Sequence, residues 1–233
     1  MEPRVIFISS SGRSGSKSVA SALNLPGILS IHGAKPQIER ANCLHYRGDL
    51  KHPARVVLDA RAKIIRNTVA SGMHYVECTW FLSSLGGVLK SAFPGERIVH
   101  LVRDGRDFVR SGMARPWFKG DRRYLAREWS WSRDRWNPPQ AATSRLAKIA
   151  WLWSVQQSRI AADADELIRF EDLVDNGLPL EKIGLPLHRV VTLPRVNVTQ
   201  KHVMPPWQSW NATTRAEFQR WAGHELQFYG YAW

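Results

Sequence analysis

A glycine- and serine-rich turn carries the residues of this chain best suited to binding an anion. The segment Ser11 to Ser18 reads SGRSGSKS and follows a short apolar run, Val5 to Ser9. Where a strand feeds a glycine loop that opens a helix, free backbone N–H groups and the helix dipole favour an oxyanion. The sequence therefore predicts an anion-binding loop, with a serine-rich helix cap as the alternative. Its glycines are Gly12 and Gly15, and its charged or hydroxyl donors are Arg13, Ser14, Ser16, Lys17 and Ser18.

The spacing of the lysine separates this loop from that of ATP- and GTP-binding proteins. In their motif, G-x-x-x-x-G-K-[ST], the lysine directly follows the second glycine. Here Ser10 stands in place of the first glycine, and Ser16 separates Gly15 from Lys17. A nucleoside or small-molecule kinase with an atypical loop stays open as an alternative, with Asp59 of Val-Val-Leu-Asp as its second-motif aspartate.

A second candidate anion site follows a later apolar run. The segment Arg97 to Ser111 reads RIVHLVRDGRDFVRS, which predicts a strand ending at Arg103 and then a helix. Ser111 lies eight residues after Arg103 and falls on that helix. An arginine at a strand end and a hydroxyl on the next helix can converge on one phosphate.

These two sites, in this order, resemble those of the PAPS-dependent sulfotransferase family. The resemblance implies a P-loop-like α/β fold with a central parallel sheet flanked by helices. It also implies that the loop holds the 5′-phosphosulfate of 3′-phosphoadenosine 5′-phosphosulfate (PAPS), and that Arg103 and Ser111 hold its 3′-phosphate. The product would be adenosine 3′,5′-bisphosphate (PAP), and no metal is expected.

Shorter segments extend this resemblance over most of the chain. Arg169 to Val174, RFEDLV, is similar to the family's Tyr-Glu-Asp-Leu segment, and Phe228 to Tyr231 is similar to its closing Gly-Tyr. The family's Arg-Asp-Pro-Arg-Asp pattern has proline where this chain has Gly105, which we expect to loosen the turn without removing a ligand.

The resemblance also suggests catalytic residues. Arg13 takes the place of the basic residue that bridges the donor phosphate and the sulfuryl oxygens, and Lys17 resembles a basic residue of members that modify heparan-type glycans. Two candidates can take the acceptor's proton. Glu77 resembles the catalytic glutamate of glycan sulfotransferases, although Cys78 departs from that pattern. His32 lies at a predicted strand end, where other members often carry a histidine.

A proline-rich segment, Gly177 to Trp210, is a candidate loop over the site. Lys201 and His202 belong to it and can reach the donor. The alternative for both residues is a solvated basic patch.

The elements that must position these residues alternate between strands and helices, which predicts one α/β domain over residues 1–233. The predicted strands are Val5–Ser9, Arg55–Leu58, Tyr75–Cys78, Ile98–Val102 and Glu166–Phe170. The predicted helical regions are Phe81–Phe93, Asp121–Ala162 with a break at Asn137–Pro139, and Thr214–Tyr229.

The composition favours anionic partners and a cytoplasmic location. The net charge is +13 over 233 residues, which attracts nucleotides, acidic glycans or nucleic acid. We expect a small-molecule or glycan acceptor, anionic or aromatic, with a hydroxyl or amine. A nucleic-acid-binding protein is a weaker alternative, because only the positive charge supports it. No apolar run is long enough to span a bilayer, no signal peptide is recognised, and Cys43 and Cys78 are the only cysteines.

Six tryptophans between residues 117 and 153 are expected mostly in the core, with an aromatic acceptor cleft as the alternative.

Overall fold

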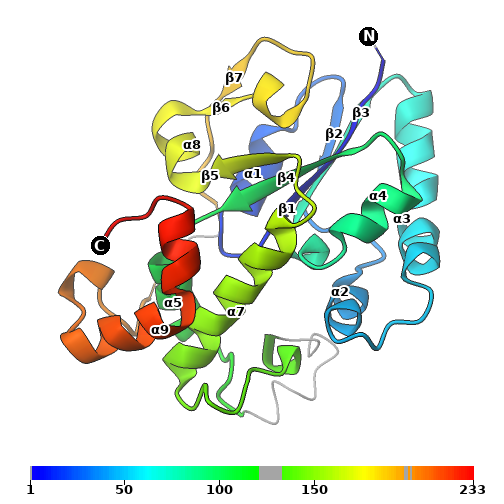
Figure 1. The fold of residues 1–233 in the computed structure, drawn as a ribbon. Helices are drawn as coiled ribbons and strands as arrows, with labels where there is room; N and C mark the ends of the chain where they lie inside the picture. The colour runs from blue at the N-terminus through cyan, green and yellow to red at the C-terminus, as the bar shows by residue number, and fades with distance from the viewer. Residues whose placement is uncertain (1, 121–132, 197–198, 200) are drawn as a thin grey trace. The chain divides into compact units, whose positions relative to one another are not determined.

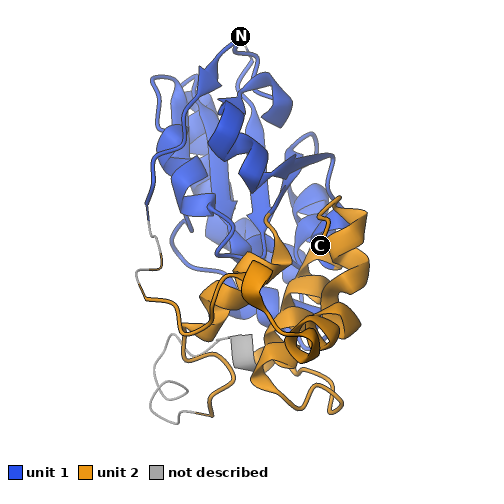
Figure 2. Cartoon of the chain, turned by 90° about the vertical axis from the view of Figure 1, so that its left-hand side faces the viewer, with its two compact units in different colours: residues 1–102, 159–197 blue, residues 103–158, 198–233 orange. Residues whose placement is uncertain are grey.

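The structure is a computed structural model that describes residues 2–120, 133–196, 199 and 201–233. It divides the chain into two compact units, each made of two chain segments (Figure 2). We call Met1–Val102 with Arg159–Asn197 the sheet unit, and Arg103–Ser158 with Val198–Trp233 the helical unit. The expectation of a single domain stays a prediction.

The sheet unit is built on a five-stranded sheet with the order β2-β3-β1-β4-β5, in which all neighbours are parallel (Figure 1). The fold is therefore α/β with a central parallel sheet flanked by helices, as the sequence predicted. The strands are β1 (Val5–Ser10), β2 (Ile28–Ile31), β3 (His74–Thr79), β4 (Arg97–Val102) and β5 (Glu166–Arg169). Four predicted strands are confirmed as β1, β3, β4 and β5, and β2 ends directly before His32.

The predicted strand Arg55–Leu58 is wrong, because these residues lie in the helix α3 (Pro53–Ala70). The β-branched pair in this segment favoured a strand, but Pro53 occupies the first helical turn, where its missing N–H costs nothing. Val57, Ile65 and Thr68 are among the residues that α3 buries, and they recur at a helical spacing. Asp59 therefore lies on a helix and does not end a strand.

The two faces of the sheet bury different side chains, because successive residues of a strand point to opposite faces. On one face, Ile6 and Ile8 of β1 belong to a core cluster with Val19 of α1 (Ser16–Ala22) and Leu173 of α8 (Phe170–Asn176). On the other face, Phe7 packs in a cluster with residues of α2 (Glu39–Tyr46), α3 and α4 (Gly86–Ala92). The middle strand, β1, is thus buried on both faces of the sheet, so packing holds the end of the strand from which the glycine loop starts.

Short elements complete the sheet unit. The 3₁₀ helix η1 (Trp80–Leu82) and α4 together replace the single helical region predicted at Phe81–Phe93. A small antiparallel pair, β6 (Leu178–Pro179) and β7 (Val190–Val191), and the 3₁₀ helix η4 (Glu181–Ile183) lie within the segment predicted to be irregular.

The helical unit contains α5 (Gly105–Met113), η3 (Arg133–Trp136), η5 (Trp207–Ser209) and α9 (Ala212–Phe228). It also contains most of α7 (Arg145–Ala161). The predicted break at Asn137–Pro139 is confirmed, because the described chain has no helix between η3 and α7. The first part of the region predicted to be helical, residues 121–132, lies outside the described residues. The last predicted helix is confirmed as α9.

Three of the six tryptophans between residues 117 and 153 are core residues, and Trp151 is half-buried. Trp117, Trp136 and Trp153 are buried, whereas Trp129 and Trp131 lie outside the described residues. Within the described residues, no helix is both long and apolar enough to cross a membrane.

Candidate functional site

The strand order of the sheet unit gathers three of the predicted site segments at one edge. β1, β3 and β2 are neighbours, with Ser9 opposite Thr79 and Ile31 opposite Glu77. The glycine loop follows β1 and His32 follows β2, so both leave the carboxyl ends of neighbouring parallel strands. This is the edge at which parallel α/β proteins bind ligands.

The loop between β1 and α1 has a backbone conformation suited to an anion. Gly12, Arg13 and Gly15 have φ angles of 77°, 54° and 81°, all in the left-handed region. Turns that mix left- and right-handed residues point successive N–H groups into one concavity, which binds anions. Gly15 is the N-cap of α1, and no side chain of the described chain forms a cap hydrogen bond there. The loop therefore has the geometry of a phosphate-binding loop.

Hydroxyl groups inside the loop hold it in this shape. Ser14 Oγ donates to the Gly12 carbonyl at 3.0 Å and lies 3.2 Å from Ser11 Oγ. The Gly12 N–H donates to Ser10 Oγ at 3.2 Å. Ser10, Ser11 and Ser14 are fully buried, so these short bonds fix the turn rather than face solvent.

An aromatic ring lies directly against the second glycine. A Cβ atom placed on Gly15 would lie 1.9 Å from Phe170 Cε2, far inside van der Waals contact. Phe170 begins α8, immediately after β5, in the segment predicted to resemble Tyr-Glu-Asp-Leu. Glycine is therefore required at position 15 for two reasons: the φ angle is left-handed, and the Phe170 ring leaves no room for a side chain. The role of Phe170 was not foreseen, because its loop partner lies 155 positions earlier in the sequence.

Glu77 is buried completely and engaged by four donors. Arg61 donates through Nε to Oε2 at 2.7 Å and through Nη2 to Oε1 at 2.9 Å. Tyr75 Oη donates to Oε2 at 2.9 Å, and the Ala34 N–H donates to Oε1 at 3.2 Å. Both side chains of the Arg61–Glu77 pair are 0% exposed.

This environment does not suit the general base predicted for Glu77. A base must reach the acceptor's proton, yet both oxygens of Glu77 already accept hydrogen bonds from protein donors. We therefore assign Glu77 to holding the structure together. Arg61 was missed by the sequence analysis, and no local signal marks it, because the pair joins a helix to a strand.

His32 has the geometry of a base. Its Nδ1 lies 2.7 Å from the Cys78 carbonyl, which can only accept, so Nδ1 carries the proton and Nε2 holds a free lone pair. The residue as a whole is exposed. Although the residue is exposed, partial desolvation by the surrounding protein lowers the pKa of His32 below its ordinary value of 6.5, and the nearby charge of Lys17 lowers this pKa further. His32 is thus neutral at pH 7, and it lies near the loop lysine.

Cys78 itself is inert. Cys43 and Cys78 are both buried free cysteines. Burial raises the pKa of the Cys78 thiol, so it stays protonated at neutral pH. Both residues fit the expectation of ordinary thiols.

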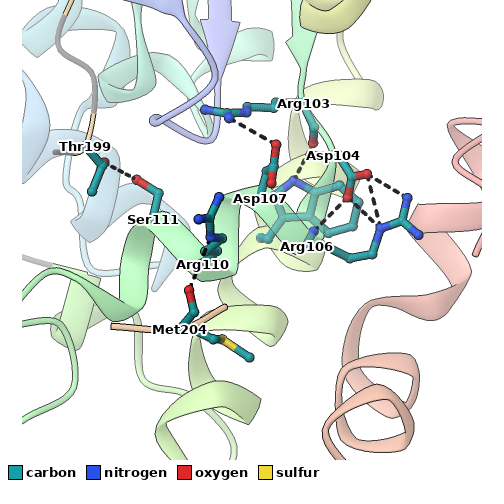
Figure 3. Close-up of polar contacts among 9 residues, drawn as sticks. Arg103, Asp104, Arg106, Asp107, Arg110, Ser111, Thr199 and Met204 are labelled. Carbon is teal, nitrogen blue, oxygen red and sulfur yellow. Dashed lines mark hydrogen bonds and ion pairs between the residues drawn. The ribbon is translucent and has the colours of Figure 1, made fainter. Parts of the chain in front are cut away.

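The second predicted site begins where β4 ends, and Figure 3 shows its residues. Arg103 directly follows β4 and is half-buried; its Nη2 lies 3.1 Å from Asp107 Oδ2. Asp107 and Ser111 are one helical turn apart on α5, so they and Arg103 share one side of the helix. Ser111 is buried, and its Oγ lies 3.0 Å from Thr199 Oγ1. Asp107 was missed, although its position four residues after Arg103 signals an ion pair.

The two arginines of this motif have different roles. Arg106 is 2% exposed and forms a bidentate pair with Asp104, with Nη2 to Oδ2 at 2.6 Å. Its guanidinium also stacks on Trp207 at 3.6 Å and donates to the Ala232 carbonyl at 2.6 Å. Asp104 in turn caps α5 by accepting from the Arg106 N–H. Arg106 is therefore structural, whereas Arg103 is only half-buried, and its contact with a phosphate stays a prediction.

Gly105 also has a packing reason. A Cβ atom on Gly105 would lie 2.7 Å from Cε3 of Trp153, which is fully buried. Trp153 Nε1 donates to the Arg103 carbonyl at 3.2 Å. The indole takes the room that a larger residue at position 105 would need. It also ties down the turn that we expected glycine to loosen.

The segment that carries Lys201 and His202 is attached to α5 on both sides. Thr199 contacts Ser111, and the Met204 carbonyl accepts from Arg110 Nε at 3.2 Å (Figure 3). Lys201 and His202 are exposed and lie between these two attachments. The late segment thus runs beside the predicted 3′-phosphate site. Contact of Lys201 or His202 with a donor stays a prediction.

The fold and the loop define a class of protein: a parallel α/β sheet with a glycine loop of the phosphate-binding type after its middle strand. No family model and no curated protein matches the sequence. Among the solved structures that are similar to the chain are two sulfotransferases. The enzyme from Alicyclobacillus acidocaldarius is 14% identical, covering 97% of this chain and 94% of that one, with a TM-score of 0.48. The sulfotransferase domain from the curacin biosynthetic pathway is 17% identical, covering 78% and 71%, with a TM-score of 0.36. Because these scores are low, the function proposed below depends on this chain's own residues.

Proposed function

We propose that the protein is a sulfotransferase that moves the sulfuryl group of PAPS to a hydroxyl or amine of a small-molecule or glycan acceptor. The observation that carries this proposal is the loop Ser11–Ser18. Its backbone has left-handed φ angles at Gly12, Arg13 and Gly15, which can direct N–H groups toward an anion, but Ser16 stands between its second glycine and Lys17. The loop thus suits an anion while departing from the lysine spacing of ATP-dependent enzymes. The position of Asp59 on α3 also removes the aspartate that a kinase would need at a strand end.

Each unit supplies one candidate site for a phosphate group of the nucleotide. In the sheet unit, Arg13 and Lys17 add positive charge to the loop and suit the 5′-phosphosulfate. In the helical unit, Arg103 and Ser111 offer a guanidinium and a hydroxyl on one side of α5, which suit the 3′-phosphate. Bound PAPS supplies an activated sulfuryl group on a good leaving phosphate.

The proposed chemistry needs a base and charge stabilisation. The Nε2 lone pair of His32 takes the proton of the acceptor hydroxyl as the acceptor oxygen bonds to sulfur. The bond between sulfur and the bridging phosphate oxygen breaks, and PAP leaves with the electron pair. Arg13 and Lys17 stabilise the charge that grows on that oxygen. The lowered pKa of His32 keeps Nε2 free at pH 7.

Nucleotide binding tests this proposal by calorimetry with three ligands: PAP, adenosine 5′-phosphate and adenosine 3′-phosphate. If one nucleotide reaches both sites, PAP binds more tightly than either monophosphate. Arg103→Ala is expected to remove a charge-assisted contact of about 1.5–3 kcal/mol, weakening PAP and adenosine 3′-phosphate roughly ten- to a hundredfold. Binding of adenosine 5′-phosphate should change little in this variant.

Arg55→Ala is the matched control, because it removes the same charge from an 84% exposed side chain on α3. It should leave all three affinities unchanged. Equal affinities for PAP and the monophosphates, or no effect of Arg103→Ala, would overturn the proposal. Magnesium-dependent ATP turnover without PAP binding would favour the kinase. Tight, salt-dependent RNA or DNA binding that PAP does not displace would favour a nucleic-acid-binding protein.

A further inference from the structure

A groove lies beside the edge strand of the sheet, away from the loop. Its volume is about 520 Å³, within the range typical of small-molecule sites. The lining comes from β2, from one face of α3, from residues 35 and 36, and from Ser71 and Met73 between α3 and β3. Because β2 is the last strand on its side of the sheet, no further strand of the described chain covers this edge. All of these elements belong to the sheet unit.

The groove has an apolar wall. Leu29, Ile64 and Met73 line it, and all three are half-buried. Leu29 and Ile64 also pack against the core cluster around Phe7, so they are held in place from behind. A ligand that covers these side chains removes apolar surface from water, which favours binding of an apolar body.

The rim of the groove is positive. Lys35 and Lys63 line it and are exposed. In the part of the chain that the structure describes, neither ammonium group forms an ion pair within 4.0 Å. Asp59 also lines the groove, but its carboxylate lies 3.8 Å from Arg55 Nε. Among the described residues, the rim therefore carries two ammonium groups without an ion-pair partner, those of Lys35 and Lys63, and one carboxylate that already has a partner, that of Asp59.

The wall that carries Lys35 is fixed by the buried pair described above. Arg61 Nη1 donates to the Pro36 carbonyl at 2.7 Å, and Nη2 donates to the Ala34 carbonyl at 3.1 Å. The Ala34 N–H donates to Glu77 at 3.2 Å. The backbone on both sides of Lys35 is thus anchored, so a ligand does not need to order it.

We propose that this groove binds an amphipathic organic anion. Its apolar body packs on Leu29, Ile64 and Met73, and its sulfonate, sulfate or carboxylate head is held by Lys35 and Lys63. The proposal is independent of the sulfotransferase activity, because no residue of the glycine loop Ser11–Ser18 lines the groove.

Two fluorescent probes test it on the full chain: 1-anilinonaphthalene-8-sulfonate, and N-phenyl-1-naphthylamine, which has the same rings without the sulfonate. We expect the sulfonate to bind more tightly. The double variant Lys35→Gln, Lys63→Gln should bind the sulfonate about fourfold more weakly, since each exposed ammonium contributes about a factor of two. Its affinity for the neutral probe should not change.

The control double variant is Lys51→Gln, Lys182→Gln, which removes the same charge from two exposed lysines outside the groove. It should bind both probes like the wild type. Ala60→Trp should fill the groove and abolish binding of both probes, with an unchanged circular dichroism spectrum as the test of folding.

Three outcomes would overturn the proposal. Equal affinity for the two probes would mean that the lysines do not contact the head group. Equal weakening in the control variant would mean that the sulfonate responds to the overall charge of +13 rather than to the groove. Displacement of the sulfonate by PAP would place the probe in the nucleotide site. Failure of PAP to bind at all would refute the proposed enzyme function, but it would not affect the proposal that the groove binds an organic anion.

Discussion

Replacing Glu77 by glutamine separates a structural carboxylate from a catalytic one. Glutamine has nearly the same shape, but it leaves the guanidinium of Arg61 buried without a counter-charge. It also turns an amide NH₂ toward Arg61 or Tyr75, where donors already meet the carboxylate at 2.7–2.9 Å. Breaking a fully buried pair typically costs about 3–5 kcal/mol, out of a total stability of about 5–15 kcal/mol. The variant should therefore lose a substantial part of the free energy of unfolding.

Urea unfolding followed by circular dichroism measures this effect. With a slope of about 2–3 kcal/mol per molar urea, the midpoint of Glu77→Gln should fall by about 1–2.5 M. Glu166→Gln is the matched control, since Glu166 begins β5 and pairs with Arg97, and the side chains of Glu166 and Arg97 are 32% and 40% exposed. Its midpoint should change by less than the equivalent of about 1 kcal/mol.

A double variant checks the cause. Combining Arg61→Met with Glu77→Gln should cost less than the sum of the two single changes, because the second change removes the charge that the first leaves unpaired. The reasoning fails if Glu77→Gln unfolds at the midpoint of the wild type. If that variant were also inactive while still binding PAP, Glu77 would be the base and His32 would not.

Three further changes test the site. His32→Gln should leave PAP affinity intact and lower turnover about 10²–10⁴-fold; in the wild type, kcat/KM should fall only as pH drops through the lowered pKa of His32, below pH 6.5, because protonation fills Nε2. A rate unchanged in His32→Gln would exclude it as the base. Gly15→Ala should weaken PAP binding and lower the melting temperature, and adding Phe170→Ala should restore only part of the loss, because the left-handed backbone still costs about 1–2 kcal/mol. Full recovery would show that only the clash matters. Gly105→Ala should cost about 1–3 kcal/mol by pressing on Trp153, and an unchanged melting temperature would contradict that contact.

The strands of the sheet were largely readable from the sequence. β1, β3 and β4 are short β-branched or apolar runs buried on both faces, which is the pattern of central parallel strands. The segment Arg55–Leu58 has the same local composition but continues as a helix, so composition over four residues could not decide. A longer window, with Pro53 at its start, contains the helical spacing.

The site was readable only where its partners are close in sequence. The loop glycines, and the segment from Arg103 to Ser111, are local motifs. The structure gives Gly12 and Gly15 left-handed φ angles and pairs Arg103 with Asp107, and the binding of an anion by either segment stays a prediction. Glu77 was correctly placed near a strand end, but its environment depends on Arg61 from another element. The tautomer of His32 depends in the same way on a carbonyl of β3. Contacts of this kind are set by packing, which a single sequence does not contain.

The position of β1 in the sheet has a consequence for synthesis of the protein. Its neighbours come much later in the chain: Val5 pairs with Tyr75 and Ile6 with Arg97. A growing chain that has not yet released β4 from the ribosome holds an apolar strand with one of its two edges unpaired. Until β4 pairs with β1, the strand that leads into the glycine loop has one unpaired edge. Phe170, which lies against Gly15 of the loop, is synthesised later still. Nucleotide affinity should therefore appear late during translation, and ribosome-bound chains of increasing length offer a way to time it.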